Sequence, residues 1–145
     1  MPETFTQALH AEHQECDRLF AIAEEAALDG NIELAKDPIG AAIAINRAHF
    51  QLEETILFPA FEEATQMTGG PTAVMRMEHD QMRDLLNRIE QATIAGKLDE
   101  VAKVFETLMI LMQQHNLKEE NMLYPMMDQA LAHKREELLA KIKAD

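Results

Sequence analysis

Histidines and glutamates recur in this chain at one fixed offset. Residues 49–59 read HFQLEETILFP and residues 115–125 read HNLKEENMLYP, so both segments have the pattern H-x-x-x-E-E-x-x-L-[F/Y]-P. The offset of 66 residues between these segments also relates His13 to His79. The chain is therefore a tandem duplication. Its two copies supply four histidines and two glutamates, a ligand set that suits a pair of metal ions.

These six residues fall on the apolar faces of expected helices. His49 and Glu53 are four residues apart, so they lie one above the other on a helix, and the second copy repeats this pair. At a rise of about 1.5 Å per residue, the helix lengths bring all six groups to one layer of a bundle. The candidate metal ligands are His13, His49, Glu53, His79, His115 and Glu119.

A buried polar layer of this size has two interpretations. Buried His–Glu ion pairs could satisfy the groups, but so large a polar cluster destabilises a fold unless something binds in it. Imidazole and carboxylate ligands suit iron, manganese or zinc. A closed zinc site needs only four ligands and often uses cysteine, so six ligands favour iron or manganese. The spacing leaves open which ligand binds which ion.

The elements that position these residues are helices. Glycine and proline number five each and cluster at expected breaks, while no sustained alternation predicts a strand. The apolar periodicity predicts an all-α, up-down-up-down four-helix bundle with a short C-terminal helical extension. Pro59 and Pro125 should kink their helices two to three turns beyond the histidines. The expected helices span about 3–28, 39–65, 71–94 and 98–131, and a last piece at about 128–143 either extends the fourth helix or turns back.

Composition narrows the classes of function. A chain of 145 residues with 47% hydrophobic content forms one folded domain. Its net charge of −13 argues against binding to nucleic acid or to an anionic membrane surface. A single cysteine rules out an internal disulfide. Because the start reads Met-Pro-Glu-Thr and no apolar run reaches about 18 residues, we expect a cytoplasmic protein without a secretory signal or membrane span.

The motifs resemble those of the hemerythrin-like, HHE cation-binding family, over about residues 5–130. The resemblance implies a hemerythrin-like bundle around a non-haem di-iron centre. The six candidates would then be the iron ligands, with Glu53 and Glu119 as carboxylate bridges. It also implies a single domain over 1–145, built from hairpins at about 1–66 and 67–132 and an extension at about 132–145. The matching motifs are Glu12-His13, His49-x-x-x-Glu53 with Leu-Phe-Pro, Glu78-His79, and His115-x-x-x-Glu119 with Leu-Tyr-Pro.

Two departures separate this chain from the oxygen-carrying members of that family. Met75 stands where those proteins have an extra histidine, and the last motif reads H-x-x-x-E in place of H-x-x-x-x-D. The resemblance therefore implies a di-iron protein that binds or senses O₂, NO or peroxide, with manganese or zinc as alternative metals. An oxidoreductase such as a ferroxidase or peroxidase, an iron donor for iron–sulfur repair, and a non-catalytic helical module stay open. So does the oligomeric state.

Several residues have weaker claims. His10 could be a seventh ligand but is expected at the rim, and His133 is expected on the surface. Cys16 is expected to be a small buried side chain, and Tyr124 to point to the face opposite the site. Four glutamates that flank ligands either orient imidazoles or are solvated: Glu12, Glu54, Glu78 and Glu120. Four methionines are expected to line the site: Met75, Met82, Met112 and Met122.

Overall fold

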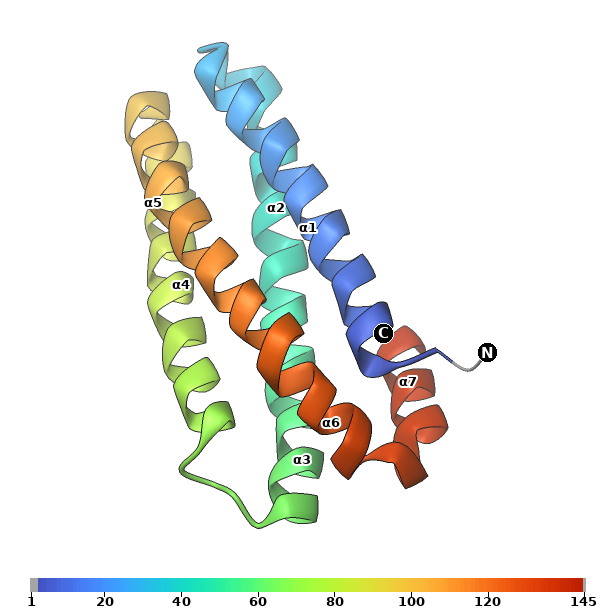
Figure 1. Ribbon diagram of the computed structural model, residues 1–145. Coiled ribbons are helices and arrows are strands. Elements are labelled where there is room, and N and C mark those ends of the chain that lie inside the picture. The colour runs from blue at the N-terminus through green and yellow to red at the C-terminus, as the bar shows by residue number, and fades with distance from the viewer. Residues whose placement is uncertain (1–2, 145) are drawn as a thin grey trace.

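The computed structural model describes residues 3–144, and each element in that range is a helix. Four long helices run up and down as neighbours (Figure 1): α1 (Phe5–Leu28), α2 (Ile32–Leu52), α4 (Pro71–Ile94) and α5 (Leu98–Lys118). This arrangement confirms the all-α bundle that the periodicity predicts. The domain predicted over 1–145 includes residues 1, 2 and 145, which lie outside the described residues.

Two of the long helices continue through a π turn. Helix α2 passes through η1 (Glu53–Leu57) into α3 (Phe58–Thr65), and α5 passes through η2 (Glu119–Leu123) into α6 (Tyr124–Ala130). In each turn the first residue of the next helix donates its N–H to the carbonyl five residues back. A proline follows directly in both copies and has no N–H to give. The irregularity therefore begins at the glutamates, earlier than the kinks predicted from the prolines.

The second helix begins at Ile32, and the predicted start near residue 39 is wrong. The Asn31 side chain accepts hydrogen bonds from the N–H groups of Glu33 and Leu34 and caps the helix. Ala35 is buried and extends the apolar stripe by one turn. Pro38 lies inside the helix, and the carbonyl that loses its donor belongs to Leu34, which is 72% exposed and open to water.

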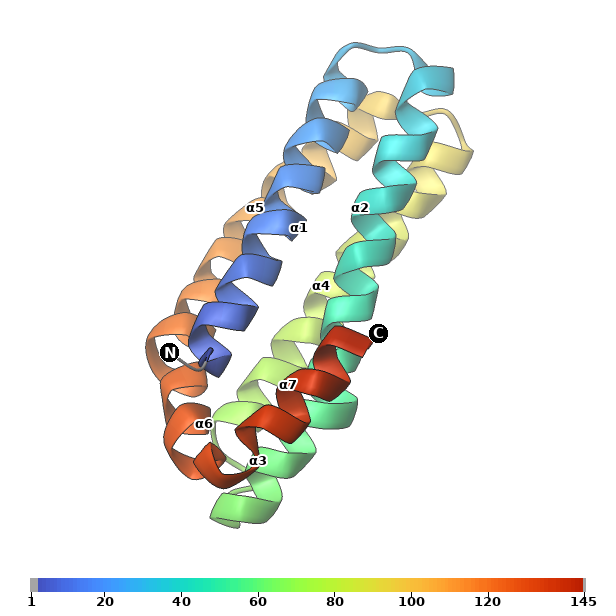
Figure 2. The same cartoon turned by 90° about the vertical axis from the view of Figure 1, so that its right-hand side faces the viewer.

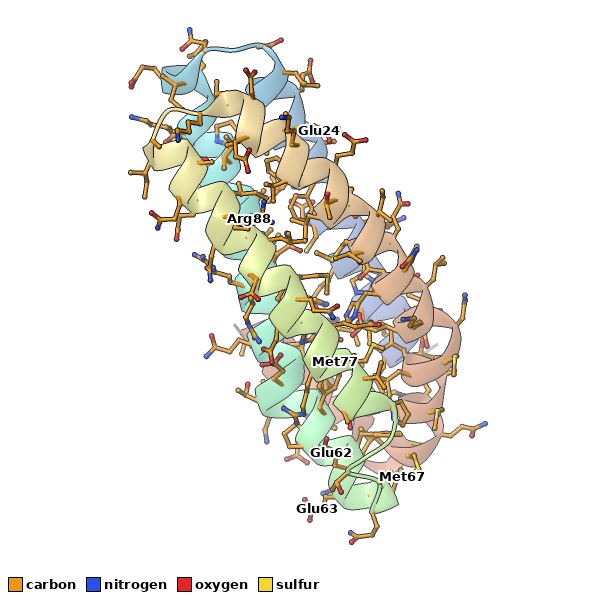
Figure 3. The ribbon with its side chains drawn as sticks, turned by 90° about the vertical axis from the view of Figure 1, so that its left-hand side faces the viewer. Glu24, Glu62, Glu63, Met67, Met77 and Arg88 are labelled. Atoms are coloured by element: carbon orange, nitrogen blue, oxygen red, sulfur yellow. The ribbon has the colours of Figure 1, made fainter. Side chains whose placement is uncertain are left out.

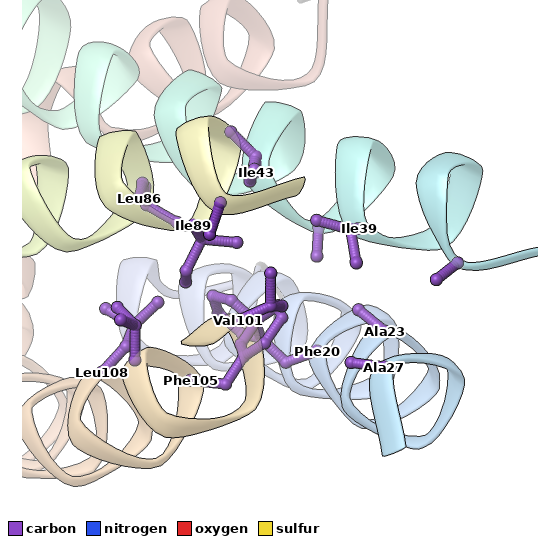
Figure 4. Packing of buried hydrophobic residues seen from close by; sticks show 14 of the residues in the cluster. Phe20, Ala23, Ala27, Ile39, Ile43, Leu86, Ile89, Val101, Phe105 and Leu108 are labelled. Carbon is purple, nitrogen blue, oxygen red and sulfur yellow. The ribbon is translucent and has the colours of Figure 1, made fainter. Parts of the chain in front are cut away.

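The hydrophobic core consists of two clusters. One lies toward the α1–α2 and α4–α5 connections and includes Phe20, Leu86 and Phe105 (Figure 4). The other lies toward the opposite end and includes Phe5 and Phe61. Each long helix passes from one cluster to the other through one of the four candidate histidines. The polar residues therefore form a layer between two apolar blocks that keep bulk water away.

The C-terminal piece turns back on the bundle. After a 3₁₀ turn, η3 (Ala132–Lys134), helix α7 (Arg135–Ala144) packs against α1 and η1 (Figure 2). Its buried face consists of Leu138, Leu139 and Ile142. Charged side chains such as Glu63 and Arg88 lie on the outside of the bundle (Figure 3). Within residues 3–144, no helix is both long and apolar enough to span a membrane.

Candidate metal centre

The structure brings all six predicted ligand residues into one layer, which we call the His–Glu layer. Every long helix contributes one histidine, and each π turn contributes its first residue, a glutamate. None of the six is more than 5% exposed. The members are His13 on α1, His49 on α2, Glu53 on η1, His79 on α4, His115 on α5 and Glu119 on η2.

Both carboxylates lie between the two halves of the chain. The Oε1 atom of Glu119 lies 3.1 Å from Nε2 of His13, and its Oε2 atom lies 3.3 Å from Nε2 of His115. The Oε1 atom of Glu53 lies 3.1 Å from Nε2 of His79 and 3.4 Å from Nε2 of His49. Each glutamate therefore faces one histidine from each hairpin.

The layer divides into two groups that could each hold a metal ion. Within each group, the candidate ligand atoms all lie within 4.8 Å of one another. Glu119 belongs to both groups, so the two sites would share it. One group contains His13, His49 and Glu119, and the other contains Glu53, His79, His115 and Glu119.

Several buried polar atoms in this layer lie 3.1–3.4 Å from one another but make no well-aligned hydrogen bond. A buried polar atom left unpaired destabilises a fold by about 1–3 kcal/mol, so several in one place need an explanation. All are imidazole nitrogens or carboxylate oxygens, which are the ligand atoms that iron, manganese and zinc prefer. The donor set therefore fits a metal. Within the described residues, these atoms are Nε2 of His49, His79 and His115, Oε1 of Glu53 and Oε2 of Glu119.

An outer ring of four glutamates orients the imidazoles. A carboxylate at Nδ1 holds a proton on that nitrogen and turns Nε2 inward, where it can bind a metal once its own proton is lost. The sequence left open whether these glutamates orient imidazoles or are solvated. Their contacts with the four Nδ1 atoms show that they orient imidazoles. The distances to Nδ1 are 2.8 Å from Glu120 to His13, 2.6 Å from Glu54 to His79, 2.9 Å from Glu78 to His115, and 3.4 Å from Glu12 to His49.

Three of these outer glutamates are themselves held by a basic side chain. Arg83 binds Glu54 through two hydrogen bonds of 2.8 and 2.9 Å. Lys118 contacts Glu78, and His10 contacts Glu120. His10 therefore lies at the rim, as expected, and supports a glutamate of the outer ring. Among residues 3–144, the fourth outer glutamate, Glu12, contacts no arginine or lysine and no histidine besides His49.

Two histidines of the layer, each four residues before a central glutamate, have strongly raised pKa values. Burial lowers the pKa of His49, but the carboxylates of Glu53, Glu12 and Glu119 outweigh it and raise the value to about 9. Burial likewise opposes charge on His115, and Glu119 and Glu53 raise its pKa to about 9. In the metal-free protein, these imidazoles therefore carry protons at neutral pH.

The two central carboxyl groups have opposite proton affinities. Burial, reinforced by the charge of Glu119, raises the pKa of Glu53 above its ordinary value. Burial also works to raise the pKa of Glu119, but its contacts with Glu53, His115 and His13 hold it well below the usual range. A bound cation would remove the repulsion between the two carboxylates.

Tyr124 lies inside the layer, and the prediction that it points to the opposite face is wrong. Its hydroxyl lies 2.7 Å from Oε2 of Glu53, 2.8 Å from Oε1 of Glu119 and 3.1 Å from Nε2 of His13. The π turn η2 places five residues in one turn and carries Tyr124 onto the face of Glu119. The proline that follows the motif in both copies indicates an irregular helix nearby, but it does not locate the π turn.

The structure also shows where the other residues singled out from the sequence lie. Cys16 is buried, and burial followed by the charge of Glu12 raises the pKa of its thiol to about 12, so it stays protonated. His133 is exposed, as expected. Met122 is 60% exposed, and its predicted place beside the site is wrong because η2 turns it outward. The other three methionines expected there are buried: Met75, Met82 and Met112.

Comparisons with known proteins agree with this site. Residues 4–127 match the family described as the hemerythrin HHE cation binding domain. Three uncharacterized mycobacterial proteins, Mb2018 of Mycobacterium bovis and MT2051 and Rv1995 of Mycobacterium tuberculosis, are each 28% identical over 142 residues. The match covers 86% of this chain but 54% of each relative, so the chain spans about half the length of these relatives. No solved structure shows significant similarity. Since the family match covers most of its length and includes the whole His–Glu layer, the chain belongs to the hemerythrin HHE cation-binding family.

Proposed function

We propose that this protein binds two non-haem iron ions in the His–Glu layer, with Glu53 and Glu119 as the carboxylate bridges. His13 and His49 would serve one ion, and His79 and His115 the other. The observation that carries the proposal is the convergence, between the two hairpins, of five buried ligand atoms that make no well-aligned hydrogen bond. Bound cations would satisfy these atoms at once.

The ligand chemistry favours iron over zinc. The layer offers imidazole nitrogens and carboxylate oxygens, which suit iron and manganese. Zinc in a closed structural site commonly uses cysteine, whereas the thiol of Cys16 belongs to neither candidate group. Both bridging glutamates are completely buried and face both hairpins, which suits a linked pair of ions better than two separate ones.

We assign to this site the binding or sensing of a small molecule such as O₂, NO or peroxide. An iron pair supplies one-electron chemistry and coordination positions for such a molecule. The chain supplies the surroundings. The two apolar clusters exclude water, and the outer glutamates fix the imidazoles. The Tyr124 hydroxyl lies within hydrogen-bond distance of both central carboxyl groups and helps to fix their orientation.

Elemental analysis of protein produced with added iron, together with its absorption spectrum, tests this proposal. About two irons per chain are expected, because the layer forms two linked groups. Glu119→Ala should lose at least one of them, since both groups share that carboxylate. Glu63→Ala, which removes an exposed carboxylate on α3, is the matched control and should bind iron normally. Absence of metal after anaerobic reconstitution with Fe²⁺ would overturn the proposal.

A further inference from the structure

A groove beside His49 leads from the surface to the His–Glu layer. It lies between α1, α2 and α7 and has a volume of about 420 Å³. Although His49 is only 5% exposed, it forms part of the groove wall. Other lining residues are Glu12, Ile45, Ala48, Leu52 and Ile142. The groove therefore ends at a candidate ligand, on the side of its Nδ1 atom.

The equivalent corner of the second hairpin is almost closed. The offset of 66 residues relates Ile45 to Leu111, and Ala48 to Gln114. The cavity lined by Leu111, Gln114 and Glu78 has a volume of only about 30 Å³. Gln114 lines this small cavity at the position that the shorter Ala48 holds in the open groove. The duplication has therefore produced two similar corners, of which the His49 corner is open.

The outer glutamate at the open corner, Glu12, makes the fewest contacts with basic side chains. The other three contact Arg83, Lys118 or His10, whereas Glu12 has no such partner among residues 3–144. Its side chain is 36% exposed. The distance from Glu12 to Nδ1 of His49, 3.4 Å, is the longest of the four. A half-exposed carboxylate whose one basic contact is the 3.4 Å approach to His49, at the mouth of a groove, attracts cations.

We infer that a divalent metal ion reaches the His–Glu layer through this groove, with Glu12 as its first ligand and the His49 ring as the gate. The inference rests on the proposed function. Glu12 would draw the cation inward and release His49, whose ring is the least tightly held of the four. The ion then passes to the unpaired Nε2 and carboxylate atoms on the inner side. Apart from Glu12 and His49, the polar side chains of the groove wall are the neutral Gln51 and Thr55, so no second carboxylate competes for the ion.

The rate at which metal-free protein takes up Co²⁺ tests this route, followed by visible absorption in a stopped-flow instrument. Ala48→Gln places at the open corner the residue found at the closed one, and should slow loading several-fold. Ala48 is exposed, and Gln114 occupies the equivalent helix position, so this variant should fold. The final amount of bound cobalt should not change, because Ala48 contributes no ligand.

Glu12→Gln gives a second, independent measurement. Loss of the carboxylate should slow loading about tenfold at low salt and weaken the dependence of the rate on ionic strength. A purely structural role in holding His49 would not change the salt dependence. Ala44→Gln, at an exposed position of α2 outside the groove, is the matched control and should load at the parent rate.

The two readouts separate the inference from the function on which it rests. Loading of Ala48→Gln at the parent rate, or an unchanged salt dependence in Glu12→Gln, would overturn the route. Failure of the parent protein to bind Co²⁺ or Fe²⁺ at all would overturn the proposed function. Gln114→Ala opens the closed corner and should not slow loading. A slower rate in that variant would mean that Gln114 itself takes part in loading, which would place the route at the second corner and overturn the inference.

Discussion

The hydroxyl of Tyr124 lies 2.8 Å from Oε1 of Glu119, five residues earlier in the chain. In a regular α-helix, a residue five positions on would point about 140° away from Glu119. The π turn that begins at Glu119 removes this difference and stacks the two side chains on one face. The first copy has the same turn but carries Phe58 at the equivalent position. The Phe58 ring stacks on the His79 ring with 5.6 Å between the ring centroids. The tyrosine is therefore the main chemical asymmetry in an otherwise duplicated centre.

Tyr124→Phe should make the two halves alike and leave the iron content near two per chain. Without the hydroxyl, the pair of central carboxyl groups loses its shared hydrogen-bonding partner in the metal-free protein, which should lower the stability by about 1–3 kcal/mol. Denaturant unfolding of the metal-free and loaded forms measures this. Bound metal would satisfy the carboxylates, so the loss should shrink on loading. Loss of both irons would show that the phenol is itself needed to hold the metal.

The outer glutamates should differ in their importance for metal affinity. Removal of a carboxylate that orients a metal-binding histidine lowers affinity about 10–100-fold. The loss of affinity in Glu54→Ala should be near the upper end of this range, because Glu54 lies 2.6 Å from Nδ1 of His79 and is held by two hydrogen bonds from Arg83. The loss of affinity in Glu12→Ala should be near the lower end, since the distance from Glu12 to Nδ1 of His49 is 3.4 Å. Competition with a calibrated chelator measures both constants, and the reverse order would contradict the assigned roles.

Metal loading should release protons near neutral pH. His49 and His115 have pKa values of about 9 in the metal-free protein, so both imidazoles are charged there and must lose a proton before Nε2 can bind an ion. About two protons per chain are expected from these residues. A pH-stat titration with Co²⁺ measures the release, which should diminish when the titration is repeated well above pH 9. Loading without proton release would show that these histidines are neutral or unused.

The convergence of the six candidate residues could be predicted from the sequence, whereas the local backbone around them could not. His13 and His79 could be placed because an uninterrupted α-helix keeps a regular period of 3.6 residues on each side of them. Glu53 and Glu119 could be placed because each lies within one regular turn of its histidine. Tyr124 and Met122 could not, since the π turn between them and Glu119 shifts the periodicity by one residue. A proline predicts a disturbed hydrogen bond but does not say where the helix accommodates it.

The stability of the metal-free protein should fall as pH rises through 9. The folded-state pKa values of His49 and His115 are raised from 6.5 to about 9, so their stabilising contribution is complete below pH 6.5 and is lost as pH rises through 9. The raised pKa of Glu53 acts in the same direction. Glu119 acts oppositely, because its lowered pKa stabilises the fold above about pH 4.5 and this contribution is lost in acid. Thermal unfolding of the metal-free form, measured across this range, should therefore show the highest unfolding temperature between these limits.

The metal-loaded form should lose little stability between pH 6.5 and 9, because the ions hold the imidazoles neutral in the folded state. Equal alkaline losses in both forms would contradict this explanation and would place the titrating groups outside the His–Glu layer.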